Sequence, residues 1–171
     1  MANLWLGQHA GSHDDALVHL PSYISGYVDG EGCFAVSIAP RRTLSVGWEV
    51  RPSVSVSQNG DRIEVLLAIQ DYFGCGTLRP DRSDKTVKWE VRSLPLLWHR
   101  IIPHFQSYPL VSGKRKDSEL FADICGRMVE GKHRHPSGLV EIVLQAAQMN
   151  PSGKRRYRPD EVTKSLREMK A

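Results

Sequence analysis

Apolar positions along the chain recur with two different periods, which divide it into helical and extended segments. Spacings of three and four residues, typical of one face of an α-helix, occur over 23–30, 59–73, 93–103, 121–128, 137–149 and 162–169. Alternation with a period of two, typical of a half-buried strand, occurs over 33–39, 46–57, 76–80 and 86–92. The pattern therefore predicts an α+β fold with the order α-β-β-α-β-β-α, followed by further C-terminal helices.

Helix boundaries are predicted from capping and breaking residues. Ser22 after Pro21 is the expected N-cap of the first helix, and Asn59 or Asp61 that of the second. Ser93 and Pro95 open the third helix, which we expect to bend or end near Pro103 because proline removes a backbone donor and crowds the preceding turn. A basic loop over 112–117 is expected to precede the next helix.

The predicted strands are apolar on one side and polar on the other. In the second strand, Val50, Val54 and Val56 alternate with a polar set consisting of Glu49, Arg51, Ser53 and Ser55. In the fourth, Val87, Trp89 and Val91 alternate with Lys88, Glu90 and Arg92. Further basic residues on the same side are Arg41 and Arg42 in the first loop, Arg79 on the third strand, and Arg82 and Lys85 in the turn that follows it.

Two interpretations of this polar face remain open. An antiparallel sheet can leave one face in water. It can also be placed in the major groove of DNA, where Arg or Lys bonds guanine, Glu accepts from cytosine and Ser serves either. The mixture of acidic and basic residues favours base reading over phosphate contact alone, because phosphate contacts carry no sequence information.

Composition indicates an ordinary globular protein with a basic main part. Of the 171 residues, 40% are apolar and 25% charged, which suits one domain over 21–171 after a mobile leader over 1–20. We expect no membrane segment and an intracellular location, because the chain lacks a long apolar run and a signal-peptide pattern. The three cysteines are too widely spaced for a disulfide framework or a Cys-x-x-Cys zinc site.

Charge is distributed unevenly along the chain. The net charge is +4, yet residues 1–31 contain four acidic and no basic side chains, so the rest carries +8. A basic surface of this kind is expected of a nucleic-acid-binding protein, although it is also found on proteins that bind none.

The stretch from Tyr23 to Phe34 concentrates the candidate chemistry. Ser25, Gly26 and Gly30 leave one side of its helix almost without side chains, which permits close approach of a second helix. Glycines at 30 and 32 are expected to end this helix in a left-handed turn, leaving Asp29 and Glu31 beside unpaired carbonyl oxygens. Such oxygens suit Mg²⁺, although a helix end with two solvated acids explains the same residues.

The string Ile24-Ser25-Gly26-Tyr27-Val28-Asp29-Gly30-Glu31-Gly32 closely resembles the LAGLIDADG motif of homing endonucleases, with Glu31 in place of the last Asp of the motif. No second copy of the motif follows. The resemblance implies the LAGLIDADG core fold with a curved sheet, and a site-specific double-strand DNA endonuclease. A single motif implies a homodimer joined through the helix at 23–31 and a long pseudo-palindromic target. The alternative is a noncatalytic DNA-binding regulator, or an RNA-binding intron splicing helper, of the same fold.

The resemblance also implies roles for individual residues. Glu31 and the carbonyl of Gly30 would hold Mg²⁺, and Ca²⁺ would support binding with little or no cleavage. Lys114 would lie near the scissile phosphate and Gln58 would help to order the attacking water, while Asp29 would be mainly structural. Arg62 is a further DNA-contacting candidate. The basic run that includes Lys116 is read as a phosphate clamp, with solvated surface or a nuclear-import signal as the other interpretations.

Overall fold

A computed structural model of the chain describes residues 18–81, 85–150, 153 and 156–168. Arg82, most of the predicted leader and part of the basic segment before the last helix lie outside these residues. The elements are α1 (Leu20–Glu31), β1 (Gly32–Pro40), β2 (Trp48–Asn59), α2 (Glu64–Phe73), β3 (Thr77–Pro80), β4 (Thr86–Val91), α3 (Leu94–Leu96), a π-helix (Leu97–Ile101), α4 (Ile102–Ser107), α5 (Lys114–Val129), a 3-10 turn (Lys132–Arg134), α6 (Pro136–Ala146) and α7 (Pro159–Glu168).

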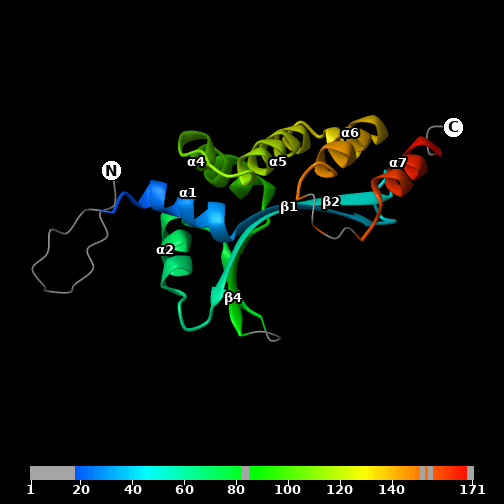
Figure 1. Cartoon of the computed structure of the whole chain (residues 1–171). Coiled ribbons are helices and arrows are strands. Elements are labelled where there is room, and N and C mark those ends of the chain that lie inside the picture. Colours follow the sequence, from blue (N-terminus) through cyan, green and yellow to red (C-terminus); the bar gives the residue numbers. More distant parts are fainter. Residues whose placement is uncertain (1–17, 82–84, 151–152, 154–155, 169–171) are drawn as a thin grey trace, which may run out of the picture.

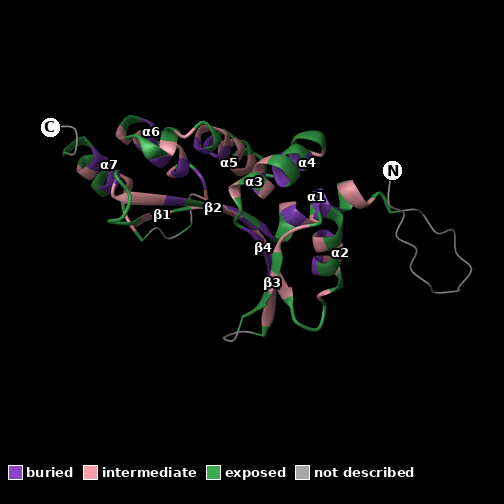
Figure 2. Ribbon diagram, turned by 180° about the vertical axis from the view of Figure 1, so that it is seen from behind, coloured by how far each residue is buried: buried purple, intermediate pink, exposed green. Residues whose placement is uncertain are grey.

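The four strands form one antiparallel sheet in the order β1-β2-β4-β3 (Figure 1). The α+β class and the α-β-β-α-β-β-α order predicted from periodicity are confirmed. The sheet is bent: β1 and β2 extend toward α7, while β3 and β4 run in a different direction (Figure 1). Helices cover one face of the bent sheet, and no described helix lies on the opposite face, which is open to solvent (Figures 1 and 2).

Strand register fixes which side chains share the helix-free face. One row of paired residues crosses the sheet through Cys33, Ser55, Glu90 and Thr77. Directly paired residues point to the same side of a sheet, and every second residue along a strand does so too. We call the helix-free side the outer face; the polar residues of β2, β3 and β4 named above lie on it.

The opposite side of the sheet forms the core with the helices (Figure 2). Phe34 of β1 packs edge-on against Phe105 and Phe121, with ring centroids 5.2 and 5.5 Å away. Trp89 of β4 is fully buried and stacks on Phe73 of α2 at 5.6 Å. Aromatic rings from three helices therefore join both halves of the bent sheet.

None of the helices in the described part of the chain has the length and apolar character needed to cross a membrane.

Several predicted boundaries are wrong, and a long-range contact explains the one at the start of α2. Asn59 belongs to β2, where it pairs with Thr86 of β4, so α2 begins only at Glu64 and neither Asn59 nor Asp61 caps it. Pairing of Asn59 with Thr86 extends β2 at the position where the local sequence favoured the start of a helix.

The third predicted helix continues past Pro103. A five-residue π-helix precedes this proline. Pro103 lacks a backbone donor and crowds the carbonyl four residues earlier, and a wider turn at that point relieves the clash. Of the two alternatives expected from the sequence, a bend or an end near Pro103, the end is excluded, because the helix continues through the distortion into α4.

Other boundaries shift at helix ends. The N-cap of α1 is His19 rather than Ser22: the His19 imidazole accepts from the Ser22 backbone N–H at 3.4 Å, so the helix starts at Leu20, just inside the predicted leader. The basic segment predicted as a loop is helical from Lys114 onward, and α6 ends at Ala146 rather than residue 149.

Candidate functional site

The C-terminal end of α1 passes directly into β1 without the predicted left-handed turn. Gly32 is extended, with φ −82° and ψ 163°, and Gly30 has no positive φ either. Gly32 is required for a different reason, since a Cβ there would lie 2.5 Å from Cγ1 of Val28 and 2.7 Å from the Val28 carbonyl oxygen. Only glycine lets the chain leave the helix so close to its last turn.

Lys114 places its ammonium group at this helix end. Its Nζ donates to the carbonyl oxygens of Val28 at 3.1 Å and Gly30 at 3.2 Å. The last carbonyls of a helix are unpaired and carry partial negative charge. The helix end and the ammonium group that meets it come from segments more than 80 residues apart in the sequence.

Asp29 anchors the segment that carries Lys114. Its carboxylate accepts from the backbone N–H groups of Val111 (3.0 Å) and Ser112 (2.9 Å), and from the Ser112 hydroxyl. Partial burial alone would raise the pKa of Asp29, but these hydrogen bonds outweigh it and hold the pKa below its ordinary value. Both Asp29 oxygens are thus used within the chain.

Glu31 is exposed and makes no hydrogen bond or ion pair within the described residues. It is therefore the free carboxylate at this helix end. Mg²⁺ is held through one or two carboxylates, waters and substrate phosphates. The described part of the chain contains no group of three or more His, Cys, Asp or Glu side chains that could hold a metal. Glu31 and the Gly30 carbonyl fit a shared metal site, and the Lys114 ammonium on Gly30 O shows that this oxygen attracts a cation.

Gln58 lies beside the same helix. Its Nε2 donates to the hydroxyl of Tyr27, which is one helical turn before Glu31, and its Oε1 accepts from the Asn59 N–H at 2.7 Å. The side chain is thereby fixed near the end of β2. Tyr27 was interpreted from sequence only as an apolar position, and nothing local in the sequence indicated that its hydroxyl would meet Gln58.

The exposed side of α1 differs in part from the predicted bare face. Gly26 and Gly30 are exposed, and a Cβ at either would meet no atom within 4 Å. Tyr23 shares this side and is 46% exposed, whereas Ser25 is buried on the other side of the helix. The glycine stripe is open, but serine is not part of it.

Ser25 belongs to a buried polar network that sequence reasoning missed. Its hydroxyl donates to the Tyr108 carbonyl oxygen at 2.7 Å and lies 3.1 Å from Nε2 of His104, while Nδ1 of His104 lies 3.0 Å from the Tyr72 hydroxyl. The network joins α1, α2 and α4. Burial lowers the pKa of His104 to about 4.

Four of the arginines predicted to contact DNA form ion pairs with carboxylates of the outer face. Arg41 and Arg51 both bind the carboxylate of Glu49, and Arg79 and Arg92 both bind that of Glu90. The remaining described candidates are exposed or half-buried without ion pairs in the described part of the chain: Arg42, Ser53, Ser55, Arg62, Lys85, Lys88 and Lys116. Arg62 lies in the turn before α2 and Lys116 in α5, so neither is on the sheet.

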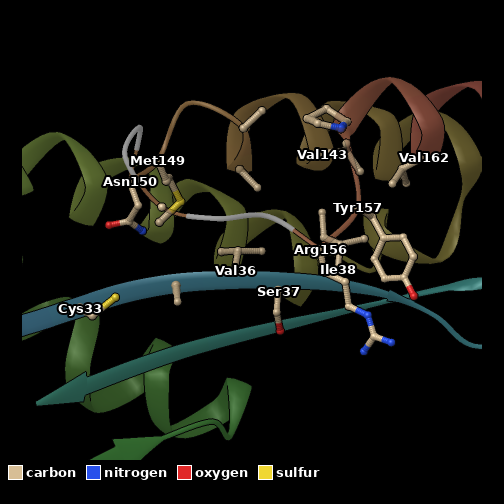
Figure 3. Close-up of a pocket in the computed structure, with 15 residues that line it drawn as sticks. Cys33, Val36, Ser37, Ile38, Val143, Met149, Asn150, Arg156, Tyr157 and Val162 are labelled. Carbon is tan, nitrogen blue, oxygen red and sulfur yellow. The ribbon is translucent and has the colours of Figure 1, made fainter. Parts of the chain in front are cut away.

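An apolar pocket of about 580 Å³ lies on the other side of β1, against α6 and α7 (Figure 3). Val36 points from β1 toward the helices, whereas Ser37 points away from them. The lining includes Ile38, Val143 and Val162 and contains no acidic side chain. It offers no chemistry related to the helix end described above.

A comparison of the sequence with models of protein families identifies the family of the chain. Residues 24–125 match the family model described as LAGLIDADG endonuclease. The chain belongs to the LAGLIDADG endonuclease family. The match includes α1 from Ile24 onward, the whole sheet and the segment that carries Lys114.

Individual relatives support this membership. The chain is 29% identical over 153 residues to homing endonuclease I-ApeII of Aeropyrum pernix, covering 86% of this chain and 90% of that protein. It is 35% identical over 131 residues to probable intron-encoded endonuclease 2 of Neurospora crassa, covering 76% of this chain. The chain spans only 29% of the length of that Neurospora protein.

Solved LAGLIDADG structures share the fold. The crystal structure of the homing endonuclease I-TnaI has a TM-score of 0.75 at 31% identity, covering 87% of this chain and 97% of that one. The archaeal intron-encoded homing endonuclease I-Vdi141I, complexed with DNA, has a TM-score of 0.81 at 26% identity, covering 88% and 96%. The predicted fold and family are confirmed.

Proposed function

We propose that this LAGLIDADG chain is one subunit of a homodimeric, Mg²⁺-dependent endonuclease that cleaves both strands of a long, pseudo-palindromic DNA target. The observation that carries the proposal is Glu31, a carboxylate unpaired within the described residues, at the end of a helix whose exposed side has an open stripe at Gly26 and Gly30. One chain supplies half of a metal site, and a second copy packed along α1 would supply the other half.

Homodimerisation is supported by the open stripe at Gly26 and Gly30. Small residues four apart allow two helix backbones to approach more closely than the usual 8–10 Å or so. Packing the two motif helices side by side would bring both Glu31 side chains to one axis. A two-fold protein requires two equivalent half-sites in its DNA, which is the reason to expect a pseudo-palindrome.

Double-stranded DNA is supported by the outer face and by the relatives. The helix-free side of the bent sheet presents arginines, lysines, serines and two carboxylates at alternate strand positions. Such side chains match the donor and acceptor pattern of the major groove. I-Vdi141I, which shares this fold, is described in complex with DNA.

The residues at the helix end suit phosphodiester hydrolysis. Glu31 and the Gly30 carbonyl would hold Mg²⁺, which stabilises the charge on the attacking and leaving oxygens. Lys114 would offset the negative charge that develops on the scissile phosphate. Gln58, an amide with no acid–base function at neutral pH, would orient the attacking water through hydrogen bonds.

The replacement Glu31→Gln tests the metal role. It keeps the size of an exposed side chain, so folding and DNA binding in Ca²⁺ should remain, while cleavage in Mg²⁺ falls below detection. Cleavage within tenfold of wild type would show that Glu31 does not hold the metal. Glu119→Gln is the matched control, because Glu119 is exposed on α5 and, among the described residues, forms an ion pair with Arg115 alone.

The first assay is a cleavage selection on a randomised duplex library in Mg²⁺. Recovery of a cleaved, pseudo-palindromic site supports the proposal. Enrichment of bound DNA without cutting would instead indicate a noncatalytic DNA-binding regulator. Failure to enrich any duplex, together with binding to structured RNA, would indicate a splicing helper of the same fold.

A further inference from the structure

Each of the two carboxylates on the outer face holds a pair of arginines. Glu49 accepts from Nη1 of Arg41 at 2.6 Å through one oxygen and from Nε of Arg51 at 2.8 Å through the other. Glu90 accepts from Nε of Arg92 at 2.9 Å and from Nη2 of Arg79. We call these the Glu49 cluster and the Glu90 cluster. From the sequence, both carboxylates were DNA-binding candidates, on the reasoning that a glutamate can accept a hydrogen bond from cytosine.

We propose that Glu49 and Glu90 do not read bases themselves but are positioning residues that set the sequence specificity of the enzyme by orienting their arginine pairs. This inference rests on the proposed function as a DNA endonuclease. It assigns base reading to the arginines and assigns the two acidic side chains a role in holding them.

Burial and hydrogen bonding support the assignment. The Glu90 side chain is only 8% exposed, whereas those of Arg79 and Arg92 are 54% and 64% exposed. The arginine side chains are therefore closer to the solvent than the Glu90 carboxylate, and DNA placed on this face would contact them first. Hydrogen bonds from Arg51 and then Arg41 hold the pKa of Glu49 below its ordinary value, so its carboxylate is ionised and already engaged at neutral pH.

The geometry of the guanidinium group explains how a held arginine can still read a base. Arg51 uses Nε together with one hydrogen of Nη2, and Arg92 uses Nε, so each carboxylate lies along the side of the guanidinium. The hydrogens at the end of the group, one on Nη1 and the second on Nη2, can still donate two parallel hydrogen bonds to O6 and N7 of guanine. A free arginine would have many rotamers and would reach phosphates as readily as bases, so fixing its direction favours base contact over phosphate contact.

The strand register predicts which base pairs of the DNA target each cluster would face. Glu90 belongs to the row Cys33–Ser55–Glu90–Thr77, which lies next to the row of Gly32 and hence to Glu31. Glu49 pairs with Ala39 at the far end of β1. Positions 49 and 55 are separated along β2 by about 20 Å, or about six base-pair steps of B-DNA. The Glu90 cluster should therefore govern base pairs nearer the cleavage point, and the Glu49 cluster base pairs about six positions further out.

The test is a binding selection on randomised duplex in Ca²⁺, with wild type, Glu90→Gln, Glu49→Gln and the control Glu119→Gln. Thermal melting first establishes that each variant is folded. Glu90→Gln should reduce guanine discrimination by about fivefold or more at inner positions of each half-site only, since a bidentate pair contributes about 5- to 150-fold. Glu49→Gln should do so only at outer positions. Glu119→Gln should leave the profile unchanged.

Tighter nonspecific binding would not by itself support the inference, because each change from Glu to Gln removes a negative charge and so raises the net charge of the protein. The decisive comparison is made in a background that lacks the arginines, Arg79→Gln with Arg92→Gln. If Glu90 acts through them, adding Glu90→Gln to this background leaves the remaining base preferences unchanged. A preference for cytosine that depends on Glu90 in this background would show direct reading and overturn the inference.

The remaining outcomes separate this inference from the proposed function. A folded Glu90→Gln variant with a wild-type profile would overturn the positioning role while leaving the endonuclease proposal intact. A wild-type protein that enriches no duplex sequence would refute both proposals at once.

Discussion

The buried histidine of the network behind the motif helix should make the stability of the protein depend on pH between about 4 and 6.5. His104 is 6% exposed, and its neighbours on α1, α2 and the segment after α4 are Ser25, Tyr72 and Tyr108, none of which is charged at neutral pH. The Ser25 hydroxyl donates to Tyr108 O, so it accepts from Nε2–H of the imidazole, while Nδ1 accepts from Tyr72. This arrangement satisfies the neutral ring.

The magnitude follows from the pKa. Burial lowers the pKa of His104 from 6.5 to about 4, so the unfolded chain binds a proton more readily than the folded one. The stabilisation is complete above the unfolded pKa and is lost as the pH falls toward the folded value. Linkage gives a loss of about 2 kcal/mol between pH 7.5 and pH 5 and of about 3 kcal/mol by pH 4.

Urea unfolding at pH 7.5 and pH 5, on wild type and His104→Gln, measures this effect. The variant should be less stable than wild type at pH 7.5 but should lose about 2 kcal/mol less on going to pH 5. His99→Gln, at an exposed histidine of the adjacent π-helix, should follow the wild-type pH dependence. The carboxylates with lowered pKa, including Asp29, lose their contribution only at more acidic pH and do not interfere at pH 5. Equal pH dependence in wild type and His104→Gln would refute the reasoning.

Two further predictions concern glycines. Gly26→Gln should stabilise the isolated subunit by up to about 1 kcal/mol, because a Cβ there would meet no atom within 4 Å and glycine is a poor helix former. The longer side chain should nevertheless block helix-to-helix packing, so sedimentation should show a monomer that no longer cleaves DNA. A stable, active dimer would contradict the helix-packing model. Gly76→Ala should destabilise the fold by about 2 kcal/mol or more, since φ is +96° and a Cβ would lie 2.2 Å from Nε1 of Trp89; an unchanged melting temperature would show that the Trp89 contact is easily relieved.

The sequence predicted the elements because each is encoded by local periodicity. Alternation in β2 and β4 identified the strands and the polar face, and spacings of three and four identified Ile24 and Val28 as buried positions of α1. The motif at 23–34 located the helix end and its two carboxylates. These features depend on neighbours within a few residues, so the chain specifies them without reference to the fold.

Partners that are distant in sequence could not be assigned in this way. Asp29 meets Ser112 and Ser25 meets His104, across separations of 83 and 79 residues. Periodicity indicates that a residue is buried but not which residue it will face. The roles of Lys114 and Gln58 were implied by family resemblance alone, and they stay predictions, although both side chains lie at α1.

The arginine–glutamate clusters show the same division. The sequence placed Arg79 and Glu90 on one face, but only the register of β3 against β4 decided that a nearly buried carboxylate would hold two exposed arginines. Likewise, the local signal for a helix at Asn59 lost to its pairing with Thr86. Local sequence determined which faces exist, because period and propensity act over a few residues. Tertiary packing decided which groups meet across those faces, because contacts between distant residues form only when the whole sheet and its helices are assembled.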